Sequence, residues 1–372
     1  MAVVKSSTFA FPIRTALVWG CVAYTTLFTS PSFAADALPP PSYSEKTGEA
    51  LAKLQPLLTA KNWDGAQSLL DGIIASAPAD SYDRAVATEI KAKIYLQNSE
   101  FPKALTMLES IISMGEAHKN FFDQKSILEY LYYLAQLYYQ EGANTKVVAT
   151  QQQYFNKALL YIRRWIESSP KKDENATMFY ASILYNQAVV TGGDKVDLNL
   201  LKQARHEIEE GLLMSPKPKD GFYTLLLATL QQEGDFARSA EVLEQLVTQK
   251  PENKVYWQQL MGTYLNLAGA GEKDPAKIQE YYARSINSLE RAQARGLLKD
   301  PKDNYNLVSI YFNAQQFGKA TDLLYNGLKS GSIEADVKNY ELLAYSYQQV
   351  NQELQAINVL KEATKLYPKN GQ

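Results

Sequence analysis

Residues that could carry out catalysis or bind a metal are few in this sequence. Its 2 histidines, His118 and His206, lie far apart, and neither has partner ligands at metal-binding spacing, so a surface or helix-end role is favoured. The nucleophile motifs G-x-S-x-G and H-E-x-x-H are absent, as is S-x-x-K with the partner motifs that it needs. The sequence therefore predicts no metal site, no other cofactor and no hydrolytic chemistry of these kinds.

Two glutamates are each followed by serine, as is the single catalytic glutamate of lytic transglycosylases. They are Glu109-Ser110 and Glu167-Ser168, and neither is followed by a glycine-rich segment similar to "GLMQ". Both pairs lie at the predicted ends of helices, so we interpret them as solvated helix ends. We predict that the protein is not an enzyme.

Residues 1–34 differ from the rest of the chain and have the layout of a secretory signal peptide. Lys5 and Arg14 precede the apolar run "TALVWGCVAYTTLFTS", and the small residues Ser32 and Ala34 stand at the expected cleavage position. A membrane anchor would need roughly 20 apolar residues and no cleavage signal. We predict cleavage after Ala34, no membrane span in the processed chain, and export to the periplasm of a Gram-negative bacterium.

The single cysteine offers a second interpretation of this segment. "VWGC" is faintly similar to a bacterial lipoprotein box, in which Cys21 would be lipidated, although the bulky Trp19 stands inside the box. Cleavage after Ala34 removes Cys21, and a processed chain without disulfides suits a bacterial periplasm better than a secreted animal protein. The same cleavage removes the positive charges of Lys5 and Arg14 from a chain of formal net charge -2, so the processed chain is more negative still. A negative net charge argues against nucleic acid or an anionic membrane as partner.

Beyond residue 34 the chain divides into a proline-rich spacer and a long repetitive region. Residues 35–48 contain Pro39, Pro40 and Pro41, which favour an extended conformation. The repeat is clearest in "YELLAYSYQQVNQELQAINVLKEATKLYP", in which small residues stand where two helices would touch and large apolar residues flank them. The residues that match the tetratricopeptide repeat (TPR) signature are Tyr340, Leu343, Ala344, Tyr347, Ala356, Leu360, Ala363 and Pro368. This segment resembles the TPR family.

The second-helix part of this signature recurs along residues 49–372. Its small residue stands at Ala66, Ala104, Ala158, Ala204, Ser239, Ser285, Ala320 and Ala356. Three intervals are longer, and their extra segments, "QEGANTKVVATQQQYF", "VVTGGDKVDLNLLK" and "LAGAGEKDPAKIQEYY", predict lengthened helices with a loop. The sequence thus predicts an all-α solenoid of about eight helix pairs, and the resemblance implies the right-handed superhelix of TPR-type arrays.

The TPR resemblance also implies where a partner would bind. In that family the first helices of successive repeats line a concave groove that holds a protein or an extended peptide. The groove positions stand six and two residues before the signature tyrosine and one or two after it. The candidates at these positions are Tyr132, Gln136, Tyr139, Gln140, Gln187, Gln232, Asn266, Tyr305, Phe312, Asn313, Tyr345 and Gln349.

Amides recur at the position two residues after the signature tyrosine or its equivalent. They are Gln97, Gln140, Gln187, Gln232, Asn266, Asn313 and Gln349. Because an amide both donates and accepts hydrogen bonds, this row could bind the backbone of an extended peptide. The alternative is that each amide is simply a polar residue that closes the first helix.

Three hypotheses for function follow. The first is a non-enzymatic periplasmic scaffold or adaptor; the last two repeats are similar to TPR proteins encoded beside ExbB, ExbD and TonB, which implies a role accessory to TonB-dependent energy transduction. The second is a glycan- or peptidoglycan-binding module that stacks sugars on Tyr132, Tyr139, Tyr305 and Phe312. The third, an enzyme, has no motif to support it. The partner, the cargo and the oligomeric state do not follow from the sequence.

Overall fold

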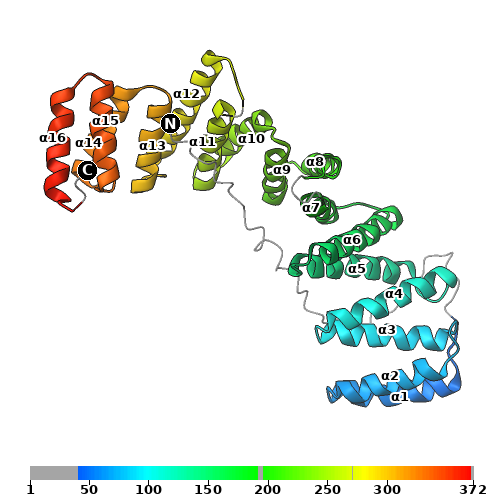
Figure 1. Cartoon of the computed structure of the whole chain (residues 1–372). Coiled ribbons are helices and arrows are strands. Elements are labelled where there is room, and N and C mark those ends of the chain that lie inside the picture. Colours follow the sequence, from blue (N-terminus) through cyan, green and yellow to red (C-terminus); the bar gives the residue numbers. More distant parts are fainter. Residues whose placement is uncertain (1–40, 192–195, 270, 370–372) are drawn as a thin grey trace. The chain divides into compact units, whose positions relative to one another are not determined.

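All regular structure in the chain is helical among the residues that the computed structural model describes, which are 41–191, 196–269 and 271–369 (Figure 1). The helices are α1 Glu45–Thr59, α2 Trp63–Ser76, α3 Tyr82–Gln97, α4 Phe101–Ala117, α5 Gln124–Asn144, α6 Val148–Ser168, α7 Glu174–Thr191, α8 Leu198–Leu213, α9 Asp220–Glu233, α10 Phe236–Gln249, α11 Lys254–Gly269, α12 Pro275–Ala294, α13 Pro301–Asn313, α14 Phe317–Ser330, α15 Val337–Gln349 and α16 Glu353–Leu366. The predicted all-α fold of eight helix pairs is confirmed. The predicted signal peptide lies outside the described residues.

The first helix begins before the predicted start of the repeat region at residue 49. Ser44 is the N-cap of α1, and its hydroxyl accepts a hydrogen bond of 3.3 Å from the backbone N–H of Thr47. Ser44 is itself held, because its backbone N–H and hydroxyl both donate to Oδ1 of Asp83, at 3.0 and 2.6 Å. These bonds satisfy donors at the helix start. The predicted boundary of the spacer at residue 48 is therefore wrong, since α1 starts at Glu45.

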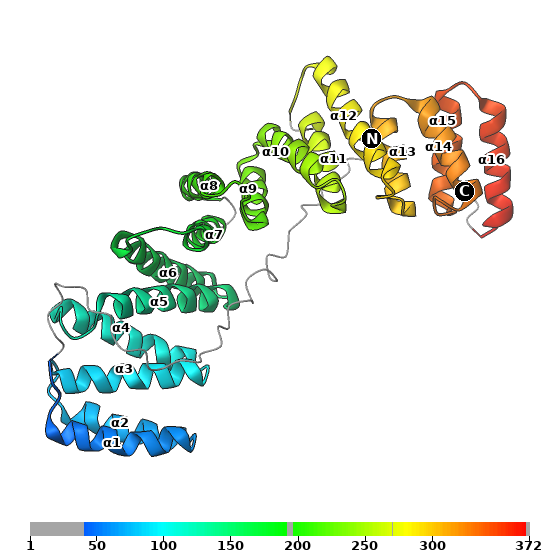
Figure 2. The same cartoon turned by 180° about the vertical axis from the view of Figure 1, so that it is seen from behind.

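Successive helices pack side by side, and Figures 1 and 2 show them from opposite sides. The two helices of a repeat contact each other, as in α7 with α8 and α15 with α16. From α6 onward, the second helix of a repeat also contacts the next first helix, as in α10 with α11 and α14 with α15. The small residue at the crossing is buried in every pair: Ala66, Ala104, Ala158, Ala204, Ser239, Ser285, Ala320 and Ala356. A small side chain is needed there because it lets the two helix backbones approach closely.

Two glycines show how tightly the helices are joined. Gly211 lies on α8, where an added Cβ would stand 2.1 Å from Cε1 of Phe222 on α9, so only glycine fits this crossing. Gly234 ends α9 in a left-handed conformation with φ of 74°. The backbone N–H of the next residue, Asp235, then donates to the carbonyl of Leu230 at 2.9 Å, which satisfies a carbonyl at the helix end.

Four helices are longer than those of the regular repeats. Helices α5 and α6 have 21 residues each, α7 has 18 and α12 has 20. Of the three long segments, the first forms the end of α5 and the beginning of α6, and the third forms the end of α11 and the beginning of α12. Part of the second, residues 192–195, lies outside the described residues.

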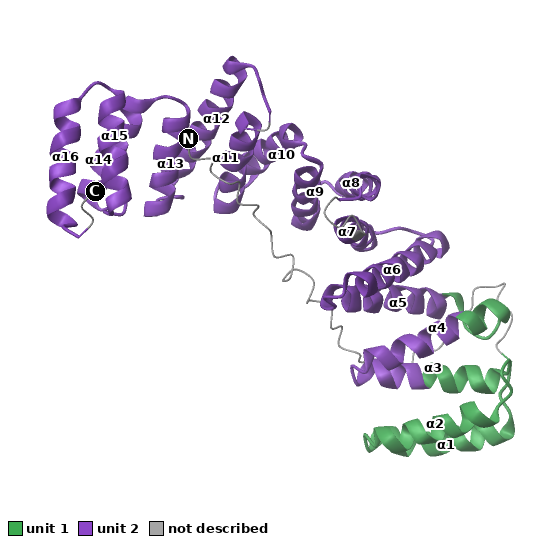
Figure 3. Cartoon of the chain, viewed as in Figure 1, with its two compact units in different colours: residues 1–90, 113–124 green, residues 91–112, 125–372 purple. Residues whose placement is uncertain are grey.

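The chain divides into two compact units (Figure 3). Unit 1 comprises residues 1–90 and 113–124, and unit 2 comprises residues 91–112 and 125–372. In unit 1, Leu54 of α1 and Leu70 of α2 are buried, and the rings of Tyr82 and Phe121 meet with centroids 5.5 Å apart. In unit 2, Trp257 is fully buried, and its indole N–H donates to the carbonyl of Pro251 at 2.8 Å. All the candidate groove residues lie in unit 2.

Candidate functional site

The candidate groove residues lie on the first helices of their repeats, but they do not share one environment. Those that are exposed are Gln136, Gln140, Gln232, Asn266, Tyr305, Asn313, Tyr345 and Gln349. Those that are half-buried are Tyr132, Tyr139 and Phe312. Gln187 is buried. The exposed candidates can therefore contribute to a common surface, whereas the buried Gln187 cannot.

Gln187 is not available to a partner. Helix α7 continues to Thr191, so Gln187 lies inside the helix rather than at its end, with 7% of its surface exposed. Its side-chain N–H donates to the side-chain oxygen of Asn156 on α6. Gln187 therefore joins α6 to α7, and the prediction that it lines a groove is wrong.

The other amides divide between two settings. Gln97, Asn313 and Gln349 are the last residues of α3, α13 and α15, and Gln232 is the last but one of α9, as expected of polar residues that close a helix. Gln140 and Asn266 lie about a turn before the ends of α5 and α11 and are exposed on the helix side. Helix closure therefore does not account for Gln140 or Asn266.

Tyr132 and Tyr139 belong to an aromatic cluster shared by α5, α6 and α7. The ring of Tyr132 lies 5.3 Å from that of Trp165 and 5.7 Å from that of Phe179, centroid to centroid. Tyr139 lies 5.7 Å from Phe155 and 5.5 Å from the same Phe179. Burial raises the pKa of Tyr139 to about 12. These two tyrosines hold neighbouring repeats together and offer little free ring surface.

The exposed aromatic residues among the candidates are instead in the last two repeats. Phe312 on α13 and Tyr345 on α15 stack with centroids 5.9 Å apart and 20° between their planes, and Tyr345 is 51% exposed. The ring of Phe317, the first residue of α14, meets Phe312 edge-on at 5.2 Å and fixes its position. Tyr305, 36% exposed, stands two turns before Phe312 on the same side of α13. The exposed Tyr305 and Tyr345, together with the half-buried Phe312, form what we call the exposed aromatic group.

The side of the first helices that carries this group is almost free of charge. On α13 this side is formed by Tyr305, Ser309, Phe312 and Asn313. Together with the equivalent positions on α9, α11 and α15, the residues are Thr224, Ala228, Gln231, Gln232, Gln258, Gly262, Leu265, Asn266, Tyr305, Ser309, Phe312, Asn313, Glu341, Tyr345, Gln348 and Gln349. None of these residues is buried, and Glu341 alone among them is charged. The other charged residues of α9, α11, α13 and α15 are Asp220, Glu233, Lys254, Lys302, Asp303 and Lys338, all near helix ends. We call these sixteen positions the neutral surface.

The signature tyrosine of the third repeat contacts a carboxylate of the repeat before it. The hydroxyl of Tyr138 on α5 donates to Oε1 of Glu109 on α4 at 2.8 Å. The same oxygen accepts from Tyr161 at 2.9 Å and from the Lys157 amine at 2.8 Å, both on α6. Burial alone would raise the pKa of Glu109, but the hydrogen bonds from Lys157, Tyr138 and Tyr161 outweigh it and hold the pKa below its ordinary value. The Glu109 side chain is therefore held in place by three donors and held in its ionised form.

This arrangement changes the interpretation of Glu109. Helix α4 continues to Ala117, so Glu109 is in the middle of the helix and not at a solvated end, as the sequence predicts. A catalytic acid needs a raised pKa so that it is protonated near neutral pH. The pKa of Glu109 is lowered and its oxygen is already bound by three donors, which is the opposite of that requirement.

The tyrosine–carboxylate contact recurs between later repeats. Tyr264 on α11 donates to Glu244 on α10 at 3.1 Å, and Tyr311 on α13 donates to Glu290 on α12. A cation of the tyrosine's own repeat lies over each ring: Lys157 at 4.8 Å from Tyr138, Arg284 at 5.8 Å from Tyr264 and Lys319 at 5.4 Å from Tyr311. We call each such group a Tyr–Glu contact. It joins a second helix to the first helix that follows it.

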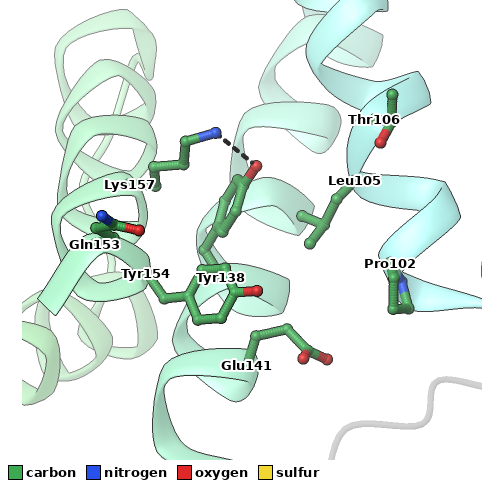
Figure 4. Close-up of a pocket in the computed structure, with 8 residues that line it drawn as sticks. All are labelled: Pro102, Leu105, Thr106, Tyr138, Glu141, Gln153, Tyr154 and Lys157. Carbon is green, nitrogen blue, oxygen red and sulfur yellow. Dashed lines mark hydrogen bonds between the residues drawn. The ribbon is translucent and has the colours of Figure 1, made fainter. Parts of the chain in front are cut away.

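A pocket of about 280 Å³ opens beside the first Tyr–Glu contact (Figure 4). Its lining comes from three helices: Pro102, Leu105 and Thr106 from α4, Tyr138 and Glu141 from α5, and Gln153, Tyr154 and Lys157 from α6. Figure 4 shows the Lys157 amine directed at the Tyr138 hydroxyl, to which it donates at 3.0 Å. Sequence reasoning missed this pocket because no single spacing links residues of three helices.

None of the described helices has an apolar stretch long enough to cross a membrane. No protein-family model matches the sequence, and neither does any curated protein.

Solved structures that are similar to this chain have low sequence identity to it. A tetratricopeptide repeat protein from Parabacteroides merdae is 13% identical, with 82% of this chain and 99% of that chain covered and a TM-score of 0.36. The nuclear import adaptor Nro1 of S. pombe is 13% identical, with 72% and 98% covered and a TM-score of 0.44. The TPR protein TTC0263 of Thermus thermophilus is 18% identical, with 53% and 93% covered and a TM-score of 0.30. The repeat fold is shown by the helix pairs of this chain.

Proposed function

We propose that this protein is a non-enzymatic TPR scaffold that binds an extended segment of a partner protein across the neutral surface of its last four repeats. The observation that carries the proposal is the stacked pair of the half-buried Phe312 and the exposed Tyr345, with centroids 5.9 Å apart on successive first helices. The exposed amides Asn313 and Gln349 follow on the same two helices. Aromatic anchors beside groups that both donate and accept hydrogen bonds suit a peptide.

The lack of charge supports an extended backbone as the ligand. Peptide N–H and C=O groups are neutral and are satisfied by amides, whereas a charged groove would select charged side chains. A neutral surface also avoids the cost of removing water from unpaired charges. The aromatic group then supplies most of the apolar contact area. We therefore expect affinity that depends weakly on salt and strongly on these rings.

The experiment uses the processed chain, from residue 35 onward, immobilised and exposed to a periplasmic extract. The double variant Tyr305→Ala with Tyr345→Ala should lose the proteins that the unmodified chain captures, because it removes exposed ring surface. Leu213→Ala is the matched control, since Leu213 on α8 is 81% exposed and lies outside the neutral surface. Capture of the same proteins by the double variant would overturn the proposal.

The same stacked rings and amides favour a second candidate, binding of an uncharged glycan. Sugars stack on aromatic rings and exchange hydrogen bonds with amides. Co-sedimentation with purified peptidoglycan separates the two candidates. Recovery on the glycan, lost in the double variant and without any captured protein, would replace the scaffold by a glycan-binding module.

The cellular location and the pathway are also proposals, and they are supported only by the sequence. The basic start, apolar run and small residues before Ala34 support export to the periplasm, and the last two repeats support a role accessory to TonB-dependent energy transduction. Cell fractionation with N-terminal sequencing should find a periplasmic chain that starts at Ala35. A lipidated Cys21 would contradict that start, and failure to crosslink to ExbB, ExbD or TonB in cells would contradict the pathway.

A further inference from the structure

The pocket beside the first Tyr–Glu contact, which we call the inter-helix pocket, has a wall that is already fixed. Tyr138 and Lys157 both line it, and both donate to Oε1 of Glu109 at 2.8 Å. These bonds hold two lining side chains in place before any ligand arrives, which lowers the entropy lost on binding. Glu141 lines the same pocket, and its carboxylate has no ion pair with any residue that the structure describes.

The charges of the inter-helix pocket favour a cation over an anion. An anion would have to compete with Glu109 for the Lys157 amine. The hydrogen bonds with Glu109 and Tyr138 raise the pKa of Lys157, so its charge persists, and the Glu109 carboxylate balances it. Glu141 is half-buried, and Figure 4 shows its carboxylate extending from α5 toward α4. A cationic group in the pocket would supply the counter-ion that Glu141 lacks.

The walls of the inter-helix pocket suit an aliphatic stem that carries the cation. Pro102 and Leu105 line it from α4, and the rings of Tyr138 and Tyr154 line it from α5 and α6 with centroids 5.9 Å apart. The faces of such rings attract cations. Lys157 already lies 4.8 Å from the Tyr138 ring, so a second cation has the Tyr154 ring to stack on.

The size and the acceptors of the pocket point to one arginine side chain. The volume of about 280 Å³ lies just below the range of about 300–1,000 Å³ for drug-sized ligands. A guanidinium is planar, stacks on aromatic rings, pairs with a carboxylate through two N–H groups and is less strongly hydrated than the ammonium of lysine. Besides Glu141, the pocket offers the hydroxyl of Thr106 and the amide oxygen of Gln153 to its remaining donors.

We propose that the inter-helix pocket binds an arginine side chain of a partner protein, with the guanidinium paired to Glu141 and stacked on Tyr154 and the stem against Leu105. Such a side chain can enter from solvent, because Pro102 and Gln153 at the pocket are exposed. The proposal goes beyond the function proposed above and does not depend on it, since no residue of the pocket belongs to the neutral surface.

The first test titrates the processed chain with N-acetyl-arginine N-methylamide, which has no backbone charge, and follows methyl NMR signals. Those of Leu105 and Thr106 should shift along a saturable curve with a dissociation constant on the order of 1 mM. Those of Leu213, 81% exposed on α8, should not move. The citrulline derivative has a similar shape without the charge and should bind at least about tenfold more weakly. Equal binding of the two compounds, or no shift with either, would overturn the proposal.

The second test changes the pocket. Glu141→Gln removes the charge with little change in size and should weaken binding of the arginine compound about tenfold. Tyr154→Leu removes the ring face and should weaken it about threefold. Glu210→Gln, at an exposed glutamate of α8, is the matched control and should bind like the unmodified chain. Circular dichroism checks that each variant is folded. Unchanged binding in Glu141→Gln would contradict the pairing.

Two more titrations identify the source and the kind of cation. Free arginine should bind no more tightly than the blocked compound, because the proposed ligand is a side chain on a polypeptide. The blocked lysine compound should bind more weakly than blocked arginine, because its ammonium is neither planar nor forked. Tighter binding of free arginine would replace the partner protein by a small-molecule ligand. Tighter binding of the lysine compound would refute the assignment to arginine.

Discussion

The hydroxyl of Tyr138 donates a hydrogen bond of 2.8 Å to the carboxylate of Glu109, a residue of the preceding repeat. Two further Tyr–Glu contacts, Tyr264 with Glu244 and Tyr311 with Glu290, join later repeats in the same way. Repeat arrays are stabilised by the interfaces between neighbouring repeats, so these contacts contribute to the free energy that holds the array together. The signature tyrosine thus joins adjacent repeats as well as filling space within its own.

Replacing Glu109 by alanine should lower the free energy of unfolding by about 1–2 kcal/mol, because three donors lose one acceptor and solvent screening reduces the effect at this partly exposed site. Those donors are Tyr138, Lys157 and Tyr161. Urea denaturation followed by circular dichroism measures the change. Glu210→Ala is the control, since Glu210 is an exposed glutamate on α8, and it should leave the urea midpoint unchanged. Equal effects of the two substitutions would show that Glu109 contributes no more than a surface charge.

Stability should depend on pH through Glu109. Because the hydrogen bonds outweigh burial, its folded-state pKa lies below the ordinary value of 4.5. The stabilisation is therefore fully present above pH 4.5 and is lost as pH falls through the folded-state pKa. The difference in unfolding free energy between the unmodified chain and Glu109→Gln should be constant from neutral pH to about pH 5 and shrink in more acidic solution. A difference that grows as pH falls would contradict the lowered pKa.

The two groups of aromatic residues should respond differently to alanine. Tyr139→Ala should lower the free energy of unfolding by about 2 kcal/mol, because its ring packs against Phe155 and Phe179 and its hydroxyl accepts from Asn186 at 3.0 Å. Tyr345→Ala should change stability by less than about 0.5 kcal/mol, as expected of a residue that is 51% exposed, yet weaken capture of the partner. Denaturation midpoints and the capture assay measure both. The reverse pattern would place the binding surface on α5.

Two helix glycines make a matched pair for testing the packing of the repeats. Gly211→Ala should destabilise the protein by about 1–3 kcal/mol, since the added Cβ would stand 2.1 Å from Phe222. Gly72→Ala should stabilise it by about 0.5–1 kcal/mol, because nothing lies within 4 Å of the added Cβ and alanine favours the helix. Thermal unfolding followed by circular dichroism measures both, and destabilisation by Gly72→Ala would show that local space does not govern the outcome.

The helix pairs could be predicted because the sequence repeats the residues that the crossing requires. Ala320 and Ala356 mark two such crossings, and both are almost fully buried. The environment of Gln187 could not be predicted, because the spacing from Tyr185 does not reveal that α7 continues to Thr191. Tyr132 and Tyr139 occupy the positions that face outward in a regular repeat, but the rings of Trp165 and Phe155 on α6 and of Phe179 on α7 pack against them.

The Tyr–Glu contacts escaped the sequence analysis although a signal for them exists. Glu109, Glu244 and Glu290 each stand five residues after the small crossing residue of their helix. Lys157, Arg284 and Lys319 each stand one residue before it. Only a comparison of charged positions between repeats, in place of apolar ones, would have shown this pattern. The exposed aromatic group differs, because its stacking depends on how α13 and α15 are placed and no spacing encodes that.

The neutral surface has a consequence for how this protein could change its ligand. In the last four repeats the second helices carry the charged residues Arg238, Glu241, Glu244, Lys277, Glu280, Arg284, Glu290, Arg291, Lys319, Asp322, Lys329, Glu353, Lys361, Glu362 and Lys365. Mutual repulsion and hydration, which keep a protein dispersed in solution, are therefore supplied by helices other than those that carry the proposed binding surface. We therefore expect that residues of the neutral surface can be exchanged without loss of solubility, so that substitutions at a few positions would change the specificity of the proposed binding surface.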